Sequence, residues 1–198
     1  MILKCEHITK SFGRKKVLKD ISFELVKGKL YGIVGENGSG KSTLLRIIVG
    51  EWQASGGKVS VNGKIGYCPQ KLLLFPQLTV EEHLQYFFAA YGMVDSLASV
   101  AEQLLHRFNF SDYRNELVSR ISGGTQQKLN LVISLLHQPD LLILDEPYNG
   151  FDWDTYQRFW EYTDDLLSSD RTILVVTHLL TETDRFDRIY SLKNGCFE

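Results

Sequence analysis

Short apolar runs separated by polar turns occupy the first quarter of the chain. The stretches Ile2 to Ile8, Ile21 to Val26 and Leu30 to Val34 have the length and composition of strands. The longer run Leu44 to Val49 predicts a helix, which Gly50 stops. Strands followed by a helix indicate an α/β arrangement from the start of the chain.

The pattern then changes from strands to helices. A β-hairpin is predicted where Val59 to Val61 and Ile65 to Tyr67 flank an Asn62-Gly63 turn. Apolar residues recur at helical spacing in three later stretches, which are Val80 to Tyr91, Val100 to Phe108 and Leu129 to Leu136. The middle of the chain is therefore expected to be mostly helical.

From residue 141 onwards, predicted strands again alternate with a predicted helix. The elements predicted there are a strand from Leu141 to Leu144, a helix from about Trp153, a strand from Ile173 to Val176 and a last strand from Ile189 to Leu192. We expect a single domain over residues 1–198, with an α/β core at about 1–70 and 139–198. A helical subdomain at about 71–138 interrupts this core.

Composition and charge describe an ordinary globular chain. Hydrophobic residues make up 43% and charged residues 23%, and a formal net charge of −2 gives no long-range attraction for nucleic acid. No stretch approaches the roughly 20 apolar residues of a membrane span, and the N-terminus lacks a signal-peptide pattern. The three cysteines are far apart. These features predict a cytosolic, reduced protein.

The first candidate for chemistry lies between the strand at 30–34 and the helix that follows it. The chain there reads Gly35-Glu36-Asn37-Gly38-Ser39-Gly40-Lys41-Ser42-Thr43, which is the P-loop pattern G-x-x-x-x-G-K-[ST]. Its glycines let backbone N–H groups face phosphate oxygens, Lys41 supplies a charge for the β- and γ-phosphates, and Ser42 is placed to ligate Mg²⁺. The alternative is a flexible Gly/Ser loop, which the strand and helix on either side argue against.

A second candidate is the strand end Leu141-Leu142-Ile143-Leu144-Asp145-Glu146. Four large aliphatic residues suit a central parallel strand, and ligands of open α/β sheets lie at such carboxyl ends. Asp145 can reach Mg²⁺ directly or through water, and Glu146 can act as a general base or position the attacking water. Without a P-loop, an acidic strand end that caps a loop would be the simpler interpretation.

The third candidate is a second helix start that can receive an anion. Ser122, Gly123 and Gly124 open the apolar run that ends at Leu136. By itself this is equally well a simple N-cap. A chain that already holds phosphates at one helix start has little use for two, unless the second serves the nucleotide of another molecule.

With these motifs in this order, the chain resembles the ATP-binding cassette (ABC) ATPases over essentially its whole length. The resemblance implies an α/β P-loop NTPase core with a parallel sheet, an N-terminal antiparallel β subdomain and an inserted α-helical subdomain. It also implies roles for five more residues: Phe12 stacks on adenine with Val17 beside it, Gln70 reaches Mg²⁺ and the attacking water, Asp152 is the D-loop aspartate, and His178 contacts the γ-phosphate.

Three residues depart from the family pattern. Thr125 stands where the signature commonly has glutamine, which would shorten a contact across a dimer. Tyr148 and Phe151 are bulkier than the usual residues around the D-loop. None of these changes removes a catalytic group, so catalysis is expected to be retained.

The resemblance implies an ATPase that uses ATP and Mg²⁺ and forms a head-to-tail dimer with a second ABC ATPase subunit, identical or not. Because no span is evident, transport would require a separate transmembrane permease subunit, with this chain on the cytoplasmic face of the cell membrane. The run from Glu146 to Asp152 is similar to that of exporter subunits, which favours efflux.

Two other classes stay open at this point. One is a soluble ABC ATPase that powers assembly, such as iron–sulfur cluster scaffolding, without transport. The other is a DNA-repair or translation-factor ATPase of the superfamily, which a single cassette without a basic surplus argues against.

Overall fold

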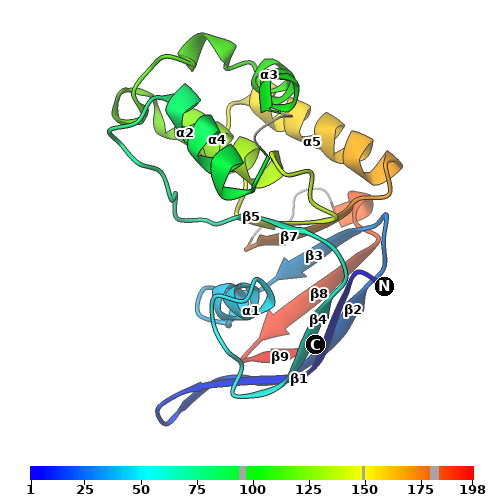
Figure 1. The fold of residues 1–198 in the computed structure, drawn as a ribbon. Coiled ribbons are helices and arrows are strands. Elements are labelled where there is room, and N and C mark those ends of the chain that lie inside the picture. The colour runs from blue at the N-terminus through cyan, green and yellow to red at the C-terminus, as the bar shows by residue number, and fades with distance from the viewer. Residues whose placement is uncertain (94–96, 149, 179–182) are drawn as a thin grey trace.

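The computed structural model describes residues 1–93, 97–148, 150–178 and 183–198. Its elements form two sheets with helices on either side of the larger one (Figure 1). The smaller sheet has the order β2 (Lys15–Leu25), β1 (Leu3–Phe12), β4 (Gly56–Val61). The larger sheet has the order β5 (Ile65–Cys68), β6 (Leu141–Asp145), β7 (Thr172–Thr177), β3 (Leu30–Val34), β8 (Arg188–Lys193), β9 (Cys196–Phe197).

The larger sheet is parallel from β5 to β8, and only the β8–β9 pair at its edge is antiparallel. Every residue of β6 and β7 is buried, which explains why both read as continuous apolar runs. Alternate residues face opposite sides: Leu142 and Leu144 pack with the helices above the sheet, whereas Leu141 and Ile143 pack towards the smaller sheet. The carboxyl ends of β3, β6 and β7 therefore meet at one edge.

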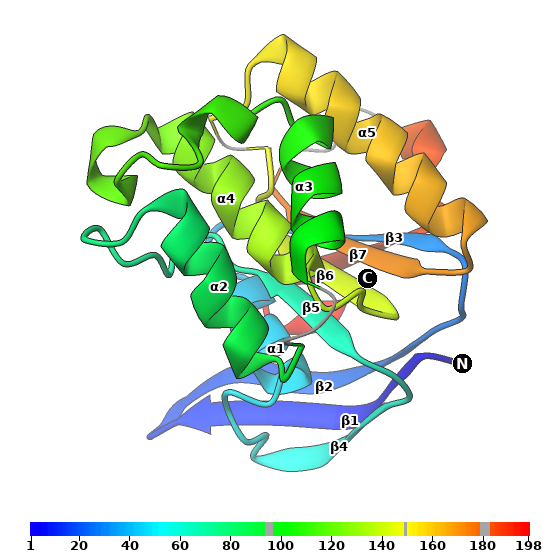
Figure 2. The ribbon, with the colours of Figure 1, turned by 45° about the horizontal axis from the view of Figure 1, so that its top comes forward.

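Helices cover both faces of this sheet (Figure 2). Four lie on the same side and share its hydrophobic core, namely α2 (Val80–Ala90), α3 (Leu97–Arg107), α4 (Gly123–Leu135) and α5 (Trp153–Ser168). On the other side α1 (Lys41–Ile48) packs with the smaller sheet. Single 3-10 turns occupy Ser111–Tyr113, Val118–Arg120 and Thr183–Arg185.

The predicted hairpin around Asn62-Gly63 is wrong. Strands β4 and β5 are neighbours in sequence but belong to different sheets, because β4 pairs with β1 and β5 pairs with β6. Beyond the turn, the backbone N–H of Lys64 donates to the Asp140 carboxylate at 2.9 Å, and the Asp140 N–H donates to the Lys64 carbonyl at 2.9 Å. These bonds direct the chain to the start of β6 instead of back along β4.

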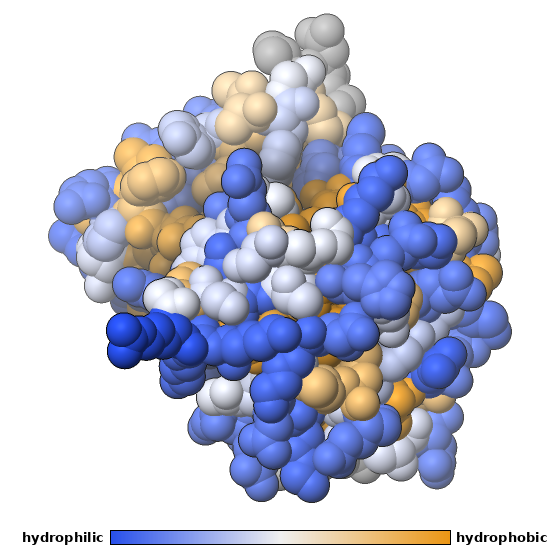
Figure 3. Space-filling model, turned by 90° about the horizontal axis from the view of Figure 1, so that it is seen from below, coloured by the Kyte–Doolittle hydropathy of each residue, from blue (hydrophilic) through white to orange (hydrophobic). Residues whose placement is uncertain are grey.

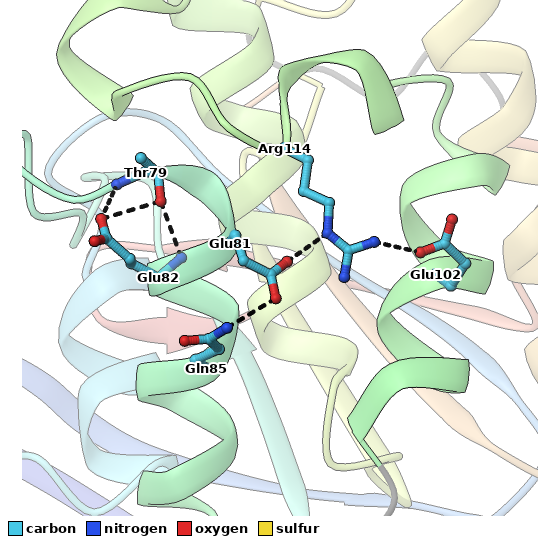
Figure 4. A network of polar contacts seen from close by, with 6 residues as sticks. All are labelled: Thr79, Glu81, Glu82, Gln85, Glu102 and Arg114. Carbon is cyan, nitrogen blue, oxygen red and sulfur yellow. Dashed lines mark hydrogen bonds and ion pairs between the residues drawn. The ribbon is translucent and has the colours of Figure 1, made fainter.

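Polar contacts fix the helices that lie between β5 and β6 (Figure 4). The Thr79 side chain and Glu82 form a reciprocal capping box at the start of α2. Arg114 donates to Glu81 of α2 and to Glu102 of α3, both at 2.6 Å, and so bridges the two helices. The Arg114 guanidinium lowers the pKa of the Glu81 carboxyl.

One face of the molecule shows how polar and apolar residues are distributed on the surface. The face seen from below in Figure 3 is covered mostly by hydrophilic residues, including the edge where the β1–β2 hairpin ends. Among the described residues, no helix combines the length and the apolar character that crossing a membrane requires.

Candidate active site

A cavity of about 560 Å³ opens at the carboxyl edge of the larger sheet. It brings together residues that are far apart in sequence, since the loop before α1, the segment after β5 and the end of β6 all line it. The predicted site residues that line it are Val17, Asn37, Gly38, Ser39, Gly40, Lys41, Ser42, Thr43, Gln70, Asp145 and Glu146. The first two candidate motifs, the P-loop and the carboxylates at the end of β6, therefore lie at one site.

The loop before α1 has the geometry of an anion cradle. Gly40 is the N-cap of α1 with φ 113°, a backbone conformation that favours glycine. Lys41 is buried, and its Nζ donates to the carbonyl oxygens of Gly35 at 2.6 Å and Glu36 at 3.2 Å. The ammonium group is thus held beside the free N–H groups of the first turn of α1, where a phosphate would lie.

Asp145 has a strongly perturbed environment. Burial and the neighbouring charge of Glu146 raise its pKa to about 6, while Lys41, Arg46 and a hydrogen bond from Ser42 oppose that rise. A divalent cation at this point would offset both causes. The oxygens of Ser42, Gln70 and Asp145 are the type of ligand that Mg²⁺ prefers, and all three residues line the cavity. The residues therefore fit a magnesium ion.

Glu146 is buried and held by the end of β7. Its backbone lies in the left-handed region with φ 52°. One carboxylate oxygen accepts from the Thr177 hydroxyl at 3.0 Å. The other accepts from the His178 N–H at 2.8 Å and contacts His178 Nδ1 at 2.7 Å. A carboxylate offers about four lone-pair sites, so these three contacts leave one for a molecule in the cavity.

The signature segment lies outside the residues that line this cavity. Ser122 caps α4, and its Oγ accepts from the Thr125 N–H at 3.2 Å. A Cβ on Gly124 would lie 2.4 Å from the carbonyl oxygen of Gly150, so glycine is required for this close approach. A Cβ on Gly123 would meet nothing within 4 Å. The start of α4 therefore offers an open face that its own cavity does not use.

The residues that depart from the family pattern face inward. Thr125 is buried, and its hydroxyl lies 2.9 Å from Ser122 Oγ within the same chain. The shortened contact expected across a dimer stays a prediction. Tyr148 packs its ring against Trp160, and Phe151 packs against Phe159. These aromatic residues enlarge the hydrophobic core beside α5.

Phe12, Asp152 and His178 are not among the residues that line the cavity. Phe12 is 45% exposed at the end of β1, with its ring edge-on to Trp52 at 5.3 Å between centroids. Asp152 caps α5 by accepting from the Thr155 N–H at 2.7 Å, and the side chain and backbone N–H of Thr155 together lower its pKa. His178 contacts the carboxylate of Glu146, which does line the cavity. Asn149, part of the predicted D-loop run, lies outside the described residues.

Some lining residues were missed by the motifs. Lys15, Lys16 and Lys19 of β2 line the cavity, as do Asn194 and Gly195 from the turn between β8 and β9. With Lys41, four lysines stand against the two carboxylates of Asp145 and Glu146. The basic stretch at 14–16 was the available signal, but its position beside a phosphate site depends on how β2 packs.

The loop, the strand-end carboxylates and the positive rim together define a P-loop protein that binds the phosphates of a nucleotide. Comparison with known proteins agrees. The model of the ABC transporter family matches residues 18–149. An uncharacterized ABC transporter ATP-binding protein of Methanocaldococcus jannaschii is 38% identical over 98% of this chain and 74% of its own length. The chain belongs to the ABC transporter family and is one of its ATP-binding cassette ATPases.

Two further comparisons extend this result. The Nod factor export ATP-binding protein I of Bradyrhizobium diazoefficiens is 34% identical over 96% of this chain, which spans 66% of that protein's length. A solved ATP-binding subunit of an ABC transporter superposes with a TM-score of 0.92 at 28% identity, covering all of this chain and 88% of that one. The predicted fold class is confirmed.

Proposed function

We propose that this chain is the ATP-hydrolysing subunit of an ABC exporter. It pairs with a second ABC ATPase subunit when ATP binds and drives a separate membrane subunit. The observation that carries the proposal is the single cavity lined by the P-loop, Gln70, Asp145 and Glu146. The export function of the Bradyrhizobium relative supports efflux as the direction.

The described residues supply the chemistry of hydrolysis. Lys41 and the N–H groups that open α1 bind the β- and γ-phosphates. Ser42, Gln70 and Asp145 would hold Mg²⁺, which when bound neutralises phosphate charge. Glu146 accepts a proton from a water in line with the γ-phosphate, and His178 holds the Glu146 carboxylate while contacting that phosphate. The water oxygen bonds to the γ-phosphorus as the bond from that phosphorus to the β,γ-bridging oxygen breaks, giving ADP and inorganic phosphate.

The second half of the site comes from the partner. Because Ser122, Gly123 and Gly124 do not line their own cavity and Gly123 faces open space, we assign them to the nucleotide of a second copy, identical or not. The partner's helix start would stabilise the γ-phosphate, and hydrolysis would remove that bridge. Phe12 stacks on adenine beside Val17, and Asp152 acts at the interface between the two copies.

We place the subunit on the cytoplasmic face of the cell membrane, docked on a transmembrane permease. Residues 1–198 act as one domain, with the α/β core at about 1–70 and 139–198 and the helical subdomain at about 71–138. The soluble assembly ATPase is less favoured, since both named relatives described above carry transporter names. Recovery of the native complex from cytosol instead of membranes would favour that alternative.

The proposal is tested with Glu146→Gln. This variant keeps the shape of the side chain but removes the base, so it should bind ATP, lose hydrolysis by about 100-fold or more, and accumulate dimers. Phosphate release and sedimentation with ATP measure the two effects. Wild-type turnover in Glu146→Gln would contradict the role of Glu146, and Lys41→Ala, which should lose ATP binding, is the control for the site itself.

A further inference from the structure

Helix α4 lies unusually close to strand β5. A Cβ on Gly66 of β5 would lie 2.3 Å from the carbonyl oxygen of Ser134, so the missing side chain is what allows the helix to approach. One helical turn before Ser134, Asn130 points into the same interface and is only 5% exposed. A buried amide in an apolar contact is costly unless its hydrogen bonds are satisfied.

Asn130 satisfies its amide group on the segment that leaves β5. Its Nδ2 donates to the carbonyl oxygen of Pro69 at 3.0 Å and to Cys68 Sγ at 3.3 Å. Burial raises the pKa of the Cys68 thiol to about 12, so the sulfur is a neutral acceptor at ordinary pH. Both amide hydrogens are therefore used, and both acceptors directly precede Gln70 in sequence.

The carbonyl of Pro69 belongs to the same peptide plane as the backbone nitrogen of Gln70. A hydrogen bond that holds this carbonyl therefore also fixes the orientation of the Pro69–Gln70 peptide plane. Pro69 has no N–H of its own, so its carbonyl is the backbone hydrogen-bonding group that this residue offers. Gln70 lines the cavity together with Ser42 and Asp145. The hydrogen bond from Asn130 of α4 thus helps to fix the backbone position from which the Gln70 side chain extends into the cavity.

We propose that Asn130 is a positioning residue for Gln70 in ATP hydrolysis. The inference rests on the proposed function, in which Gln70 contacts Mg²⁺ and water. Asn130 lies eight residues after Ser122 on the same helix, or about 12 Å along its axis. Helix α4 therefore has two roles in this proposal. Its first residues contact the nucleotide of the partner, and Asn130 orients Gln70 towards the nucleotide bound in the cavity of the same chain.

A second contact of α4 follows the same pattern. Gln127, one turn before Asn130, is buried, and its Nε2 lies 3.5 Å from the carbonyl oxygen of Pro147. Pro147 directly follows Glu146. Although this contact is longer, it places another buried amide of α4 next to the segment that carries Glu146, a second residue that lines the cavity.

The test is a double-mutant cycle with Asn130→Leu and Gln70→Ala, measured as kcat and KM for ATP on the purified full chain. Leucine has the same number and branching of side-chain heavy atoms as asparagine but donates no hydrogen bond. We expect Asn130→Leu alone to lower kcat about tenfold, with KM changed less than about twofold. In the Gln70→Ala background the same substitution should change kcat by less than about twofold, because its effect passes through Gln70.

Ser134→Ala is the matched control. Ser134 is buried on the same helix and donates only to the Leu131 carbonyl, so its loss should leave kcat at the wild-type value. If Asn130→Leu fails to fold, Asn130→Ser replaces it in the cycle, since serine is too short to reach both acceptors. An unchanged kcat in the single variant, or an equal loss of kcat in both backgrounds, would overturn the inference while leaving the ATPase proposal intact. A wild-type chain without ATP hydrolysis would overturn the proposed function.

Discussion

Two adjacent carboxylates at the end of β6 have different environments, and this difference suits two different roles. Asp145 is paired with Ser42 and faces the P-loop, with its pKa raised by burial and by its neighbour. Glu146 turns away to the end of β7, where Thr177 and His178 hold it. The left-handed backbone at Glu146 is what separates the two side chains. One residue is therefore suited to a cation and the other to a water molecule.

The raised pKa of Asp145 predicts a pH dependence of stability. The folded-state pKa of about 6 exceeds the ordinary value of 3.8, so the nucleotide-free fold binds the proton more tightly than the unfolded chain. This contribution is fully present below pH 3.8 and is lost as the pH rises through about 6. Asp145→Asn should therefore be more stable than wild type at about pH 8, and this advantage should shrink as the pH is lowered to about 5, as thermal unfolding without nucleotide can measure.

Magnesium gives the control for that prediction. With ATP present, Mg²⁺ should raise the melting temperature of wild type at about pH 8 more than that of Asp145→Asn, because only wild type offers the carboxylate. An Asp145→Asn variant that is destabilised equally at both pH values would show that the burial of this carboxyl does not strain the empty site.

Single residues were predicted well where a motif fixes backbone geometry. Lys41, Ser42, Asp145 and Glu146 all line the cavity, because the P-loop pattern and a strand end dictate where the side chains lie. The side of α4 on which Thr125 lies could not be predicted, because a helix start has an inner and an outer face, and its hydroxyl contacts Ser122 on the inner one. The lysines of β2 carry no motif, so only the packing of β2 could show their place.

At the scale of elements, α4 does more than fill the core. It begins with the segment assigned to the partner's nucleotide, packs against β5 through Gly66, and holds the peptide before Gln70 through Asn130. The segment after Gln70 then leaves the sheet towards α2. There His83 Nε2 accepts from the Phe75 N–H at 2.8 Å, which fixes this segment on α2 while Leu73 stays 60% exposed.

We expect the membrane subunit to dock on the segment after Gln70 that contains Leu73 and Phe75, and we call it the docking segment. Leu73→Ser removes an exposed apolar side chain, so it should reduce co-purification with the membrane protein that accompanies the wild-type chain. ATP binding should be unchanged, because Leu73 does not line the nucleotide cavity. Affinity purification from solubilised membranes measures the effect.

Val26→Ser is the matched control, because Val26 is 52% exposed at the turn before β3 and belongs to neither the cavity nor the docking segment. Undiminished co-purification of the Leu73 variant, or an equal loss in both variants, would argue against this docking surface.

Most elements could be predicted from apolar periodicity, since β3 and β6 are buried on both faces and α2 has one apolar face. The strands with which β4 and β5 pair could not be predicted in this way. An Asn-Gly turn favours a hairpin locally, but the bonds between Lys64 and Asp140 connect segments far apart in sequence. The two-residue strand β9 is too short to leave any apolar pattern.

At the scale of the whole molecule, the chain carries two half-sites that do not meet. One is the cavity beside Lys41 and Asp145, and the other is the open start of α4 at Ser122 and Gly123. In the proposed function, either half alone would leave charge on a bound triphosphate, and two copies that face each other would neutralise it. ATP would then link the subunits, and its hydrolysis would release them.

The most direct measurement is sedimentation of Glu146→Gln with ATP, with and without Gly123→Asp. A Cβ added at Gly123 meets no atom of the described residues within 4 Å, so the fold and the ATP affinity of the monomer should be unchanged. Its carboxylate would instead face the partner's triphosphate. We predict dimers for Glu146→Gln and monomers for the double variant, whereas a double variant that still forms dimers with ATP would contradict the account.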